Sequence, residues 1–238
     1  MISKLSKTGT YVYQTGKKRE NQDAVCCGRS RKFSVISLAD GASSCKRGGK
    51  GARTACEAIT NLLLKKGNYF LEFENDQIAG LALSHILHEL KQKAAEDSEQ
   101  VEEYSSTVAS VLVDKREGRL LCFSIGDSLI LASGSGRCRV LSAPADSRGG
   151  CCVTTTRNAE SMASVKVAET DFLDSVVICS DGAWRQMYAG NRLRPEAASL
   201  LAASDFEGLK KYLSAQDCPD DCSFVAVDLR RKNGRKSA

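Results

Sequence analysis

Two buried-strand patterns that each end in Asp-Gly constrain the fold of this chain more than any other feature. Residues 176–184 (VVICSDGAW) and 33–42 (FSVISLADGA) both run through apolar and small residues to a carboxylate, Asp181 or Asp40, which glycine follows at once. Such runs predict strands buried on both faces. The glycine permits a sharp bend and lets a ligand approach the backbone closely. Two strands that deliver an aspartate to the same kind of exit predict one metal site built from both.

The rest of the pattern predicts an α+β protein with antiparallel sheets, because helices are clustered between groups of short strands. Apolar spacing predicts two long helices and two short ones, near 50–66, 75–95, 195–203 and 205–214. Further strands are expected near 8–15, 24–27, 104–113, 120–125, 129–132, 138–141, 165–167 and 224–229, and a surface loop or flap over 142–162. Gly67 is expected to end the first helix. Without repeats or a Pro-rich linker, residues 1–229 are expected to form a single domain.

Charge and cysteine usage exclude several classes of function. The net charge of +5 comes mostly from residues 230–238, which are expected to be a flexible basic tail, so no nucleic-acid partner is expected for the nearly neutral body. No run reaches the ~18 apolar residues of a membrane span, and no signal peptide is recognisable, so a cytoplasmic monomer is expected. The 11 cysteines form no C-x-x-C pair, which favours reduced, buried thiols over a zinc site.

Five aspartates sit at strand ends or turns beside small residues. They are Asp23, Asp40, Asp127, Asp181 and Asp220. Carboxylate oxygens suit hard cations such as Mg²⁺ and Mn²⁺, whereas the only two histidines are neighbours on one predicted helix and offer no zinc motif. A single Asp-Gly is usually only a turn. Several such sites together, two of them ending buried strands, favour a metal centre.

Six short motifs occur in an order typical of one family. They are Asn21-Gln22-Asp23, Asp40-Gly41, Ser106-Thr107, Gly126-Asp127-Ser128, Ser180-Asp181-Gly182-Ala183-Trp184 and Asp220-Asp221-Cys222-Ser223. Together they resemble the metal-dependent type 2C serine/threonine protein phosphatases, most of all the compact bacterial members. The resemblance covers residues ~18–228 and implies a sandwich of two antiparallel β-sheets flanked by α-helices on both sides.

The resemblance also implies roles for individual residues at a pair of Mn²⁺ or Mg²⁺ ions. Asp40 would bridge both ions, the Gly41 carbonyl would bind one, and Asp181 and Asp220 would hold the other, which makes these three aspartates the catalytic set. The remaining implied positions are Asp23, partly through water; Asp127, for a third, weaker metal; Gln22, Ser128 and Asp221, beside the ligands; and Lys18 or Arg19, for the substrate phosphate. Ser106 and Thr107 would form a structural turn.

The implied activity is hydrolysis of phosphoserine and phosphothreonine in proteins, with no covalent phospho-enzyme. Two departures from the family leave alternatives open. Lys18 stands where the family has an arginine, and a lysine cannot form a bidentate fork. Gln22 stands where the family commonly has Glu, which removes one charge. A catalytically weak or dead phosphoprotein-binding module and a hydrolase of small phosphate metabolites are therefore the rival hypotheses.

Overall fold

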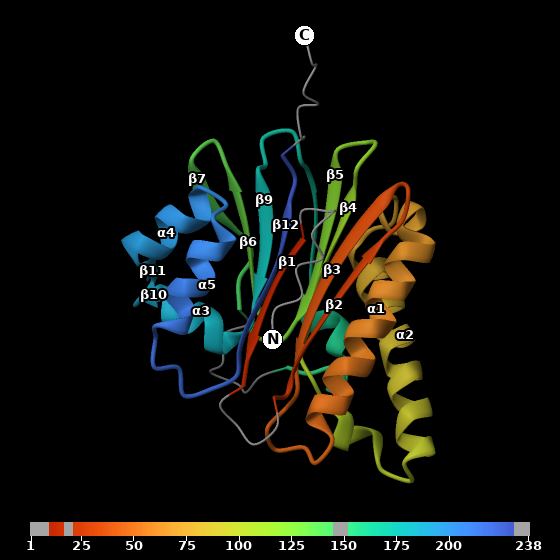
Figure 1. Ribbon diagram of the computed structural model, residues 1–238. Helices are drawn as coiled ribbons and strands as arrows, with labels where there is room; N and C mark the ends of the chain where they lie inside the picture. The colour runs from red at the N-terminus through yellow and green to blue at the C-terminus, as the bar shows by residue number, and fades with distance from the viewer. Residues whose placement is uncertain (1–9, 17–20, 145–151, 231–238) are drawn as a thin grey trace.

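Two five-stranded antiparallel sheets pack face to face, with helices outside each of them (Figure 1). The computed structural model describes residues 10–16, 21–144 and 152–230. Helices α1 and α2 cover one sheet, and α3, α4 and α5 cover the other. This arrangement confirms the expected α+β sandwich.

The two sheets draw their strands from interleaved parts of the chain. The first has the order β1 (Thr10–Thr15), β12 (Cys222–Asp228), β9 (Ser175–Cys179), β6 (Leu129–Gly134) and β7 (Arg137–Ser142). The second has the order β2 (Asp23–Arg29), β3 (Phe33–Asp40), β4 (Val108–Asp114), β5 (Arg119–Ile125) and β8 (Ser164–Glu169). The helices are α1 (Gly48–Phe70), α2 (Asn75–Glu96), α3 (Asp181–Met187), α4 (Pro195–Ala202) and α5 (Phe206–Ser214), with short 3₁₀ turns at Val101–Tyr104 and Ala159–Met162. A two-stranded hairpin, β10 (Tyr188–Ala189) and β11 (Arg192–Leu193), follows α3.

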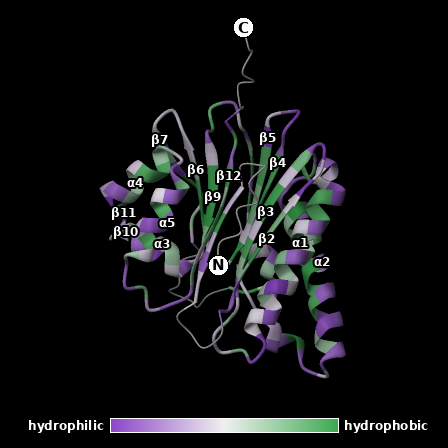
Figure 2. Cartoon of the chain, viewed as in Figure 1, coloured by the Kyte–Doolittle hydropathy of each residue, from purple (hydrophilic) through white to green (hydrophobic). Residues whose placement is uncertain are grey.

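The central strands are apolar on both faces because each face has a core to cover. In β12, Val225 and Val227 point into the core between the sheets, while Phe224 and Ala226 point toward the helices. The side-chain period of two along a strand produces this division. Apolar residues accordingly dominate the middle of the molecule, and the outer helix faces are polar (Figure 2).

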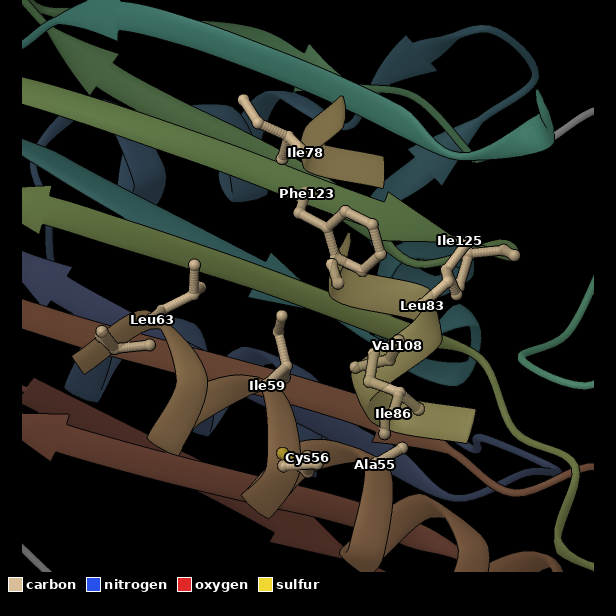
Figure 3. Close-up of a cluster of buried hydrophobic side chains, with 14 of the residues drawn as sticks. Ala55, Cys56, Ile59, Leu63, Ile78, Leu83, Ile86, Val108, Phe123 and Ile125 are labelled. Carbon is tan, nitrogen blue, oxygen red and sulfur yellow. The ribbon is translucent and has the colours of Figure 1, made fainter. Parts of the chain in front are cut away.

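Helix α1 lies chiefly over β2 and β3, and α2 lies beside α1 and near β8. Together with the sheet they enclose a second apolar core that includes Ile59, Ile86 and Phe123 (Figure 3). Helical spacing in the sequence predicts a buried face on α1, and its members are fully buried except Leu62, which is partly buried: Ala52, Ala55, Cys56, Ile59, Leu62 and Leu63. The same spacing assigns Leu81 to the apolar face of α2, but Leu81 is 48% exposed and Leu83 is buried instead.

Gly67 does not end the first helix, contrary to the sequence prediction. The helix continues to Phe70, and a Cβ on Gly67 would lie 3.0 Å from side-chain carbons of Phe33 and Leu112. The glycine therefore allows close helix–sheet packing rather than termination. No helix in the described ranges is both long enough and apolar enough to cross a membrane.

Candidate metal centre

Asp23 and Asp40 lie opposite each other where β2 begins and β3 ends. The Asp40 backbone N–H donates to Thr107 Oγ1 at 3.0 Å, and the Thr107 N–H donates to the Asp40 carbonyl at 2.8 Å. The Asp23 N–H donates to Asn21 Oδ1 at 2.8 Å. Backbone contacts thus fix both carboxylates. Ser106 and Thr107 do not form the turn that the resemblance implied, but an isolated bridge to Gly41 and bonds to Asp40.

Gly41 lies against the start of α1. Its N–H donates to the Gln22 carbonyl at 3.1 Å, and a Cβ at this position would lie 2.3 Å from the carbonyl carbon of Gly48. A Cβ on Gly51 would lie only 1.9 Å from the Tyr104 carbonyl oxygen. The Gly-rich segment 48–51 therefore allows close packing of the helix, and it holds the Asp40-Gly41 corner against the helix.

Asp181 is the first residue of α3, which corrects the prediction that it ends a strand. Strand β9 stops at Cys179, and Ser180 is the residue before the helix. A Cβ on Gly182 would lie 2.0 Å from the Asp221 carbonyl oxygen, so the 220–221 loop rests directly on this helix start. Asp221 Oδ2 accepts from the Gln22 N–H at 2.9 Å. These contacts bring Asp181, Asp220 and the Gln22-Asp23 segment together.

Asp127 comes from the turn between β5 and β6 and is joined to α3 by Trp184 and Arg185. Trp184 Nε1 donates to the Asp127 carbonyl at 2.8 Å. Arg185 Nη1 lies 2.8 Å from Asp181 Oδ2, and its Nη2 lies 4.0 Å from Asp127 Oδ2. The sequence analysis missed the contribution of Arg185. Residues 181 and 185 lie one turn apart because α3 begins at Asp181.

The aspartates are close enough to raise one another's pKa values. Burial raises the pKa of Asp40 to about 9, and the charges of Asp23, Asp181, Asp127 and Asp220 add to the rise. Burial raises the pKa of Asp23 to about 7, with a further contribution from Asp221. The pKa of Asp181 is also raised, first by burial, while the Arg185 guanidinium opposes the rise. All five predicted aspartates therefore lie in one region of concentrated negative charge.

Several buried oxygens in this region have no hydrogen-bond partner within the described part of the chain. Both Asp23 carboxylate oxygens, Asp181 Oδ1 and the Ser128 and Ser223 hydroxyls lack a hydrogen bond among the described residues. The Ser180 and Ser223 hydroxyls lie close enough to lower the pKa of Asp23 in part, although neither bonds to it with normal geometry. Buried carboxylates are normally paired, so these atoms fit the donor set of a hard divalent cation.

Within residues 10–16, 21–144 and 152–230, no three Asp, Glu, His or Cys side chains already meet at the spacing of metal ligands. Lys18 and Arg19, the predicted phosphate anchors, lie outside the described residues.

Part of the predicted flap is a packed neighbour of the site rather than a surface loop. The Thr154 N–H donates to the Ser106 carbonyl at 2.9 Å, and Thr155 Oγ1 lies 2.5 Å from Ser105 Oγ. Cys152, Thr154 and Ala159 are buried. Of the predicted loop, residues 145–151 lie outside the described ranges.

The chain is similar in sequence to one family and in fold to several solved structures. A family model described as protein phosphatase 2C matches residues 8–216. A bacterial serine phosphatase is 16% identical, with a TM-score of 0.66, over 94% of this chain and 98% of that chain. The serine/threonine phosphatase Stp1 from Staphylococcus aureus is 15% identical, with a TM-score of 0.67, over 94% and 96% of the two chains. RsbX, solved in complex with magnesium, is 15% identical, with a TM-score of 0.59, over 96% and 98%. No curated protein matches in sequence.

Proposed function

Because this chain belongs to the protein phosphatase 2C family, we propose that it is a Mn²⁺- or Mg²⁺-dependent phosphatase of phosphoserine and phosphothreonine in proteins. Family membership and the shared fold support a protein phosphatase. The observation that carries the finer proposal is the buried carboxylate of Asp23, which has no hydrogen-bond partner among the described residues and lies opposite Asp40. A buried carboxylate without a partner among the described residues is typical of a site that binds a cation.

We propose that two divalent ions bind at these carboxylates. Asp40, Asp181 and Asp220, with the Gly41 carbonyl, would hold them, and Asp23 would contribute in part through water. When bound, such ions supply a water of lowered pKa and positive charge to neutralise the phosphoryl oxygens, without a covalent phospho-enzyme. The protein's part is to keep its carboxylates in place, through the bonds of Asp40 to Thr107 and of Gln22 to Asp221.

We also propose that Lys18 or Arg19 binds the substrate phosphate, since both precede Asp23 closely in the sequence. Asp127 is proposed to take part at the edge of the site, and Ser128 and Asp221 to support the ligands. The protein is proposed to act as a cytoplasmic monomer with no nucleic-acid or membrane partner.

The test is hydrolysis of an aryl phosphate and of a phosphothreonine peptide in Mn²⁺. Wild type is expected to be active, and Asp181→Asn is expected to lose at least 100-fold in kcat/KM, because one ligand charge is removed. Asp171→Asn, an exposed aspartate in the turn before β9, is the matched control and should keep full activity. Equal activity in wild type and Asp181→Asn, or none in either, would sink the proposal.

The rival function is a regulatory phosphoprotein-binding module with little or no catalysis. Gln22 favours it, because an amide replaces a carboxylate beside the site. Calorimetric titration with Mn²⁺ separates the two functions. Binding in the micromolar to millimolar range supports the phosphatase, and its absence, with retained binding of a phosphothreonine peptide, supports the module.

A further inference from the structure

Arg185 places a positive charge between two of the aspartates of the candidate metal centre. It lies one helical turn after Asp181 in α3. Its Nη1 is 2.8 Å from Asp181 Oδ2, and its Nη2 is 4.0 Å from Asp127 Oδ2. At 2.8 Å, Arg185 and Asp181 form a close ion pair. The guanidinium thus links α3 to the turn between β5 and β6.

The position of this guanidinium is fixed by a neighbouring aromatic side chain. The Arg185 guanidinium carbon lies 5.6 Å from the centre of the Trp184 ring, within the range of a cation–π contact. Trp184 Nε1 is in turn bonded to the Asp127 carbonyl. Trp184 therefore contacts both Arg185 and Asp127. These contacts hold the guanidinium beside Asp127, although the Arg185 side chain is 54% exposed.

The two carboxylate oxygens of Asp181 have different surroundings. Oδ2 is the oxygen in the ion pair with Arg185, whereas Oδ1 is buried and has no hydrogen-bond partner in the described part of the chain. Oδ1 is thus the oxygen left for an ion shared with the other carboxylates. The side of Asp181 that faces Asp127 already has its counter-charge.

We propose that Arg185 is a built-in cation that takes the place of a third metal ion between Asp127 and Asp181. The inference rests on the proposed metal centre, and it means that this chain binds one divalent ion fewer than its acidic residues would suggest. A guanidinium at this position offsets part of the charge of the two carboxylates, occupies one ligand oxygen and repels a divalent ion. Asp127 is then a partner of Arg185 rather than a metal ligand.

The test counts Mn²⁺ ions bound to the full chain, by calorimetry and by the electron paramagnetic resonance signal of free Mn²⁺. Arg185→Glu replaces the cation with a carboxylate and is expected to bind one Mn²⁺ more than wild type. The affinity of the added site should be at least tenfold higher than that of any residual weak binding in wild type. Arg185→Lys keeps the charge and should bind the same number of ions as wild type.

Arg192→Glu, an exposed arginine on β11, makes the same change in charge away from the site and should leave the number of ions unchanged. Circular dichroism at the titration temperature confirms that each variant is folded. Equal numbers of ions in wild type and Arg185→Glu, with dissociation constants within twofold, overturn the inference but leave the proposed function standing. Absence of Mn²⁺ from both proteins overturns both. Loss of phosphopeptide affinity in Arg185→Glu, with an unchanged number of ions, would instead make Arg185 a substrate contact.

Discussion

Asp23 and Asp40 are direct partners in the antiparallel pairing of β2 and β3, so two carboxylates extend from the same face of the sheet. Like charges at such a pair destabilise a sheet. The pKa of Asp40 is raised, first by burial and then by the charge of Asp23. The site therefore destabilises the metal-free fold, and the free energy of unfolding should depend on pH and on the metal concentration.

The stability of the metal-free protein should fall as the pH rises from about 4 to about 9. The folded pKa values of Asp23 and Asp40, about 7 and about 9, exceed the ordinary value of 3.8. The native state therefore binds these protons more tightly than the unfolded chain, and this stabilisation is lost as the pH passes through the folded values. For Asp23 alone the effect is at most about 4 kcal/mol. Urea unfolding in EDTA across this range measures it.

Asp23→Asn tests whether Asp23 causes the dependence of the free energy of unfolding on pH. It removes one buried charge, so the free energy of unfolding at pH 8 in EDTA should rise and its dependence on pH should weaken. Asp171→Asn, at an exposed position, should leave the slope as in wild type. A slope unchanged in Asp23→Asn would show that other groups control the pH dependence.

Added Mn²⁺ should stabilise the protein more at pH 8 than at pH 6. Ligand carboxylates must lose their protons before they bind a metal, and at pH 6 both Asp23 and Asp40 still hold theirs in the metal-free fold. At a Mn²⁺ concentration of 100 times the dissociation constant, the gain is about 2.7 kcal/mol. Thermal unfolding at matched Mn²⁺ concentrations measures the difference. Equal stabilisation at the two pH values would contradict the proposed ligands.

Gly182→Ala should separate the 220–221 loop from the start of α3. A Cβ at this position would lie 2.0 Å from the Asp221 carbonyl oxygen, and this backbone group cannot move aside as the end of a side chain could. We expect a loss of roughly 2–4 kcal/mol in the free energy of unfolding, together with weaker Mn²⁺ binding. Urea unfolding and calorimetry measure the two effects.

Gly80→Ala is the matched control for that variant. Gly80 lies inside α2, and a Cβ there meets nothing within 4 Å. Alanine is the better helix former, so this change should stabilise the protein by about 0.5–1 kcal/mol and leave Mn²⁺ binding unchanged. If Gly182→Ala behaves like Gly80→Ala, the loop does not rest on α3 in solution.

Local patterns were sufficient to predict the buried strands and most of the helices. Strands such as β9 and β4 are apolar on both faces, and that pattern is independent of their partners. The pairing of β1 with β12 was not predictable from periodicity, because it joins the two ends of the chain. The sandwich followed from the family resemblance instead.

The part of the site that sequence reasoning missed lies in α3. Asp181-Gly182 was interpreted as a turn, and a helix of seven residues carries too little periodicity to contradict that interpretation. Without the helix, Arg185 had no defined relation to Asp181. The contact of Trp184 with Asp127 depends on the packing of α3 against the turn between β5 and β6, which no local pattern encodes.

Gln22→Glu should strengthen metal binding and weaken the metal-free fold. The Gln22 N–H is held by Asp221, and its carbonyl accepts from Gly41, so its backbone is fixed among the candidate ligands. A carboxylate there adds one negative charge to a region that already holds five aspartates. A single added charge a few ångströms from a bound ion is worth about 1–4 kcal/mol, so Mn²⁺ affinity should rise roughly tenfold or more.

Without metal, the same charge on Gln22→Glu adds repulsion, and the free energy of unfolding in EDTA at pH 8 should fall. Calorimetry measures the Mn²⁺ affinity and urea unfolding measures the free energy of unfolding of the same preparation, with Gln77→Glu on α2 as the control. Unchanged Mn²⁺ affinity would place the Gln22 side chain outside the metal centre.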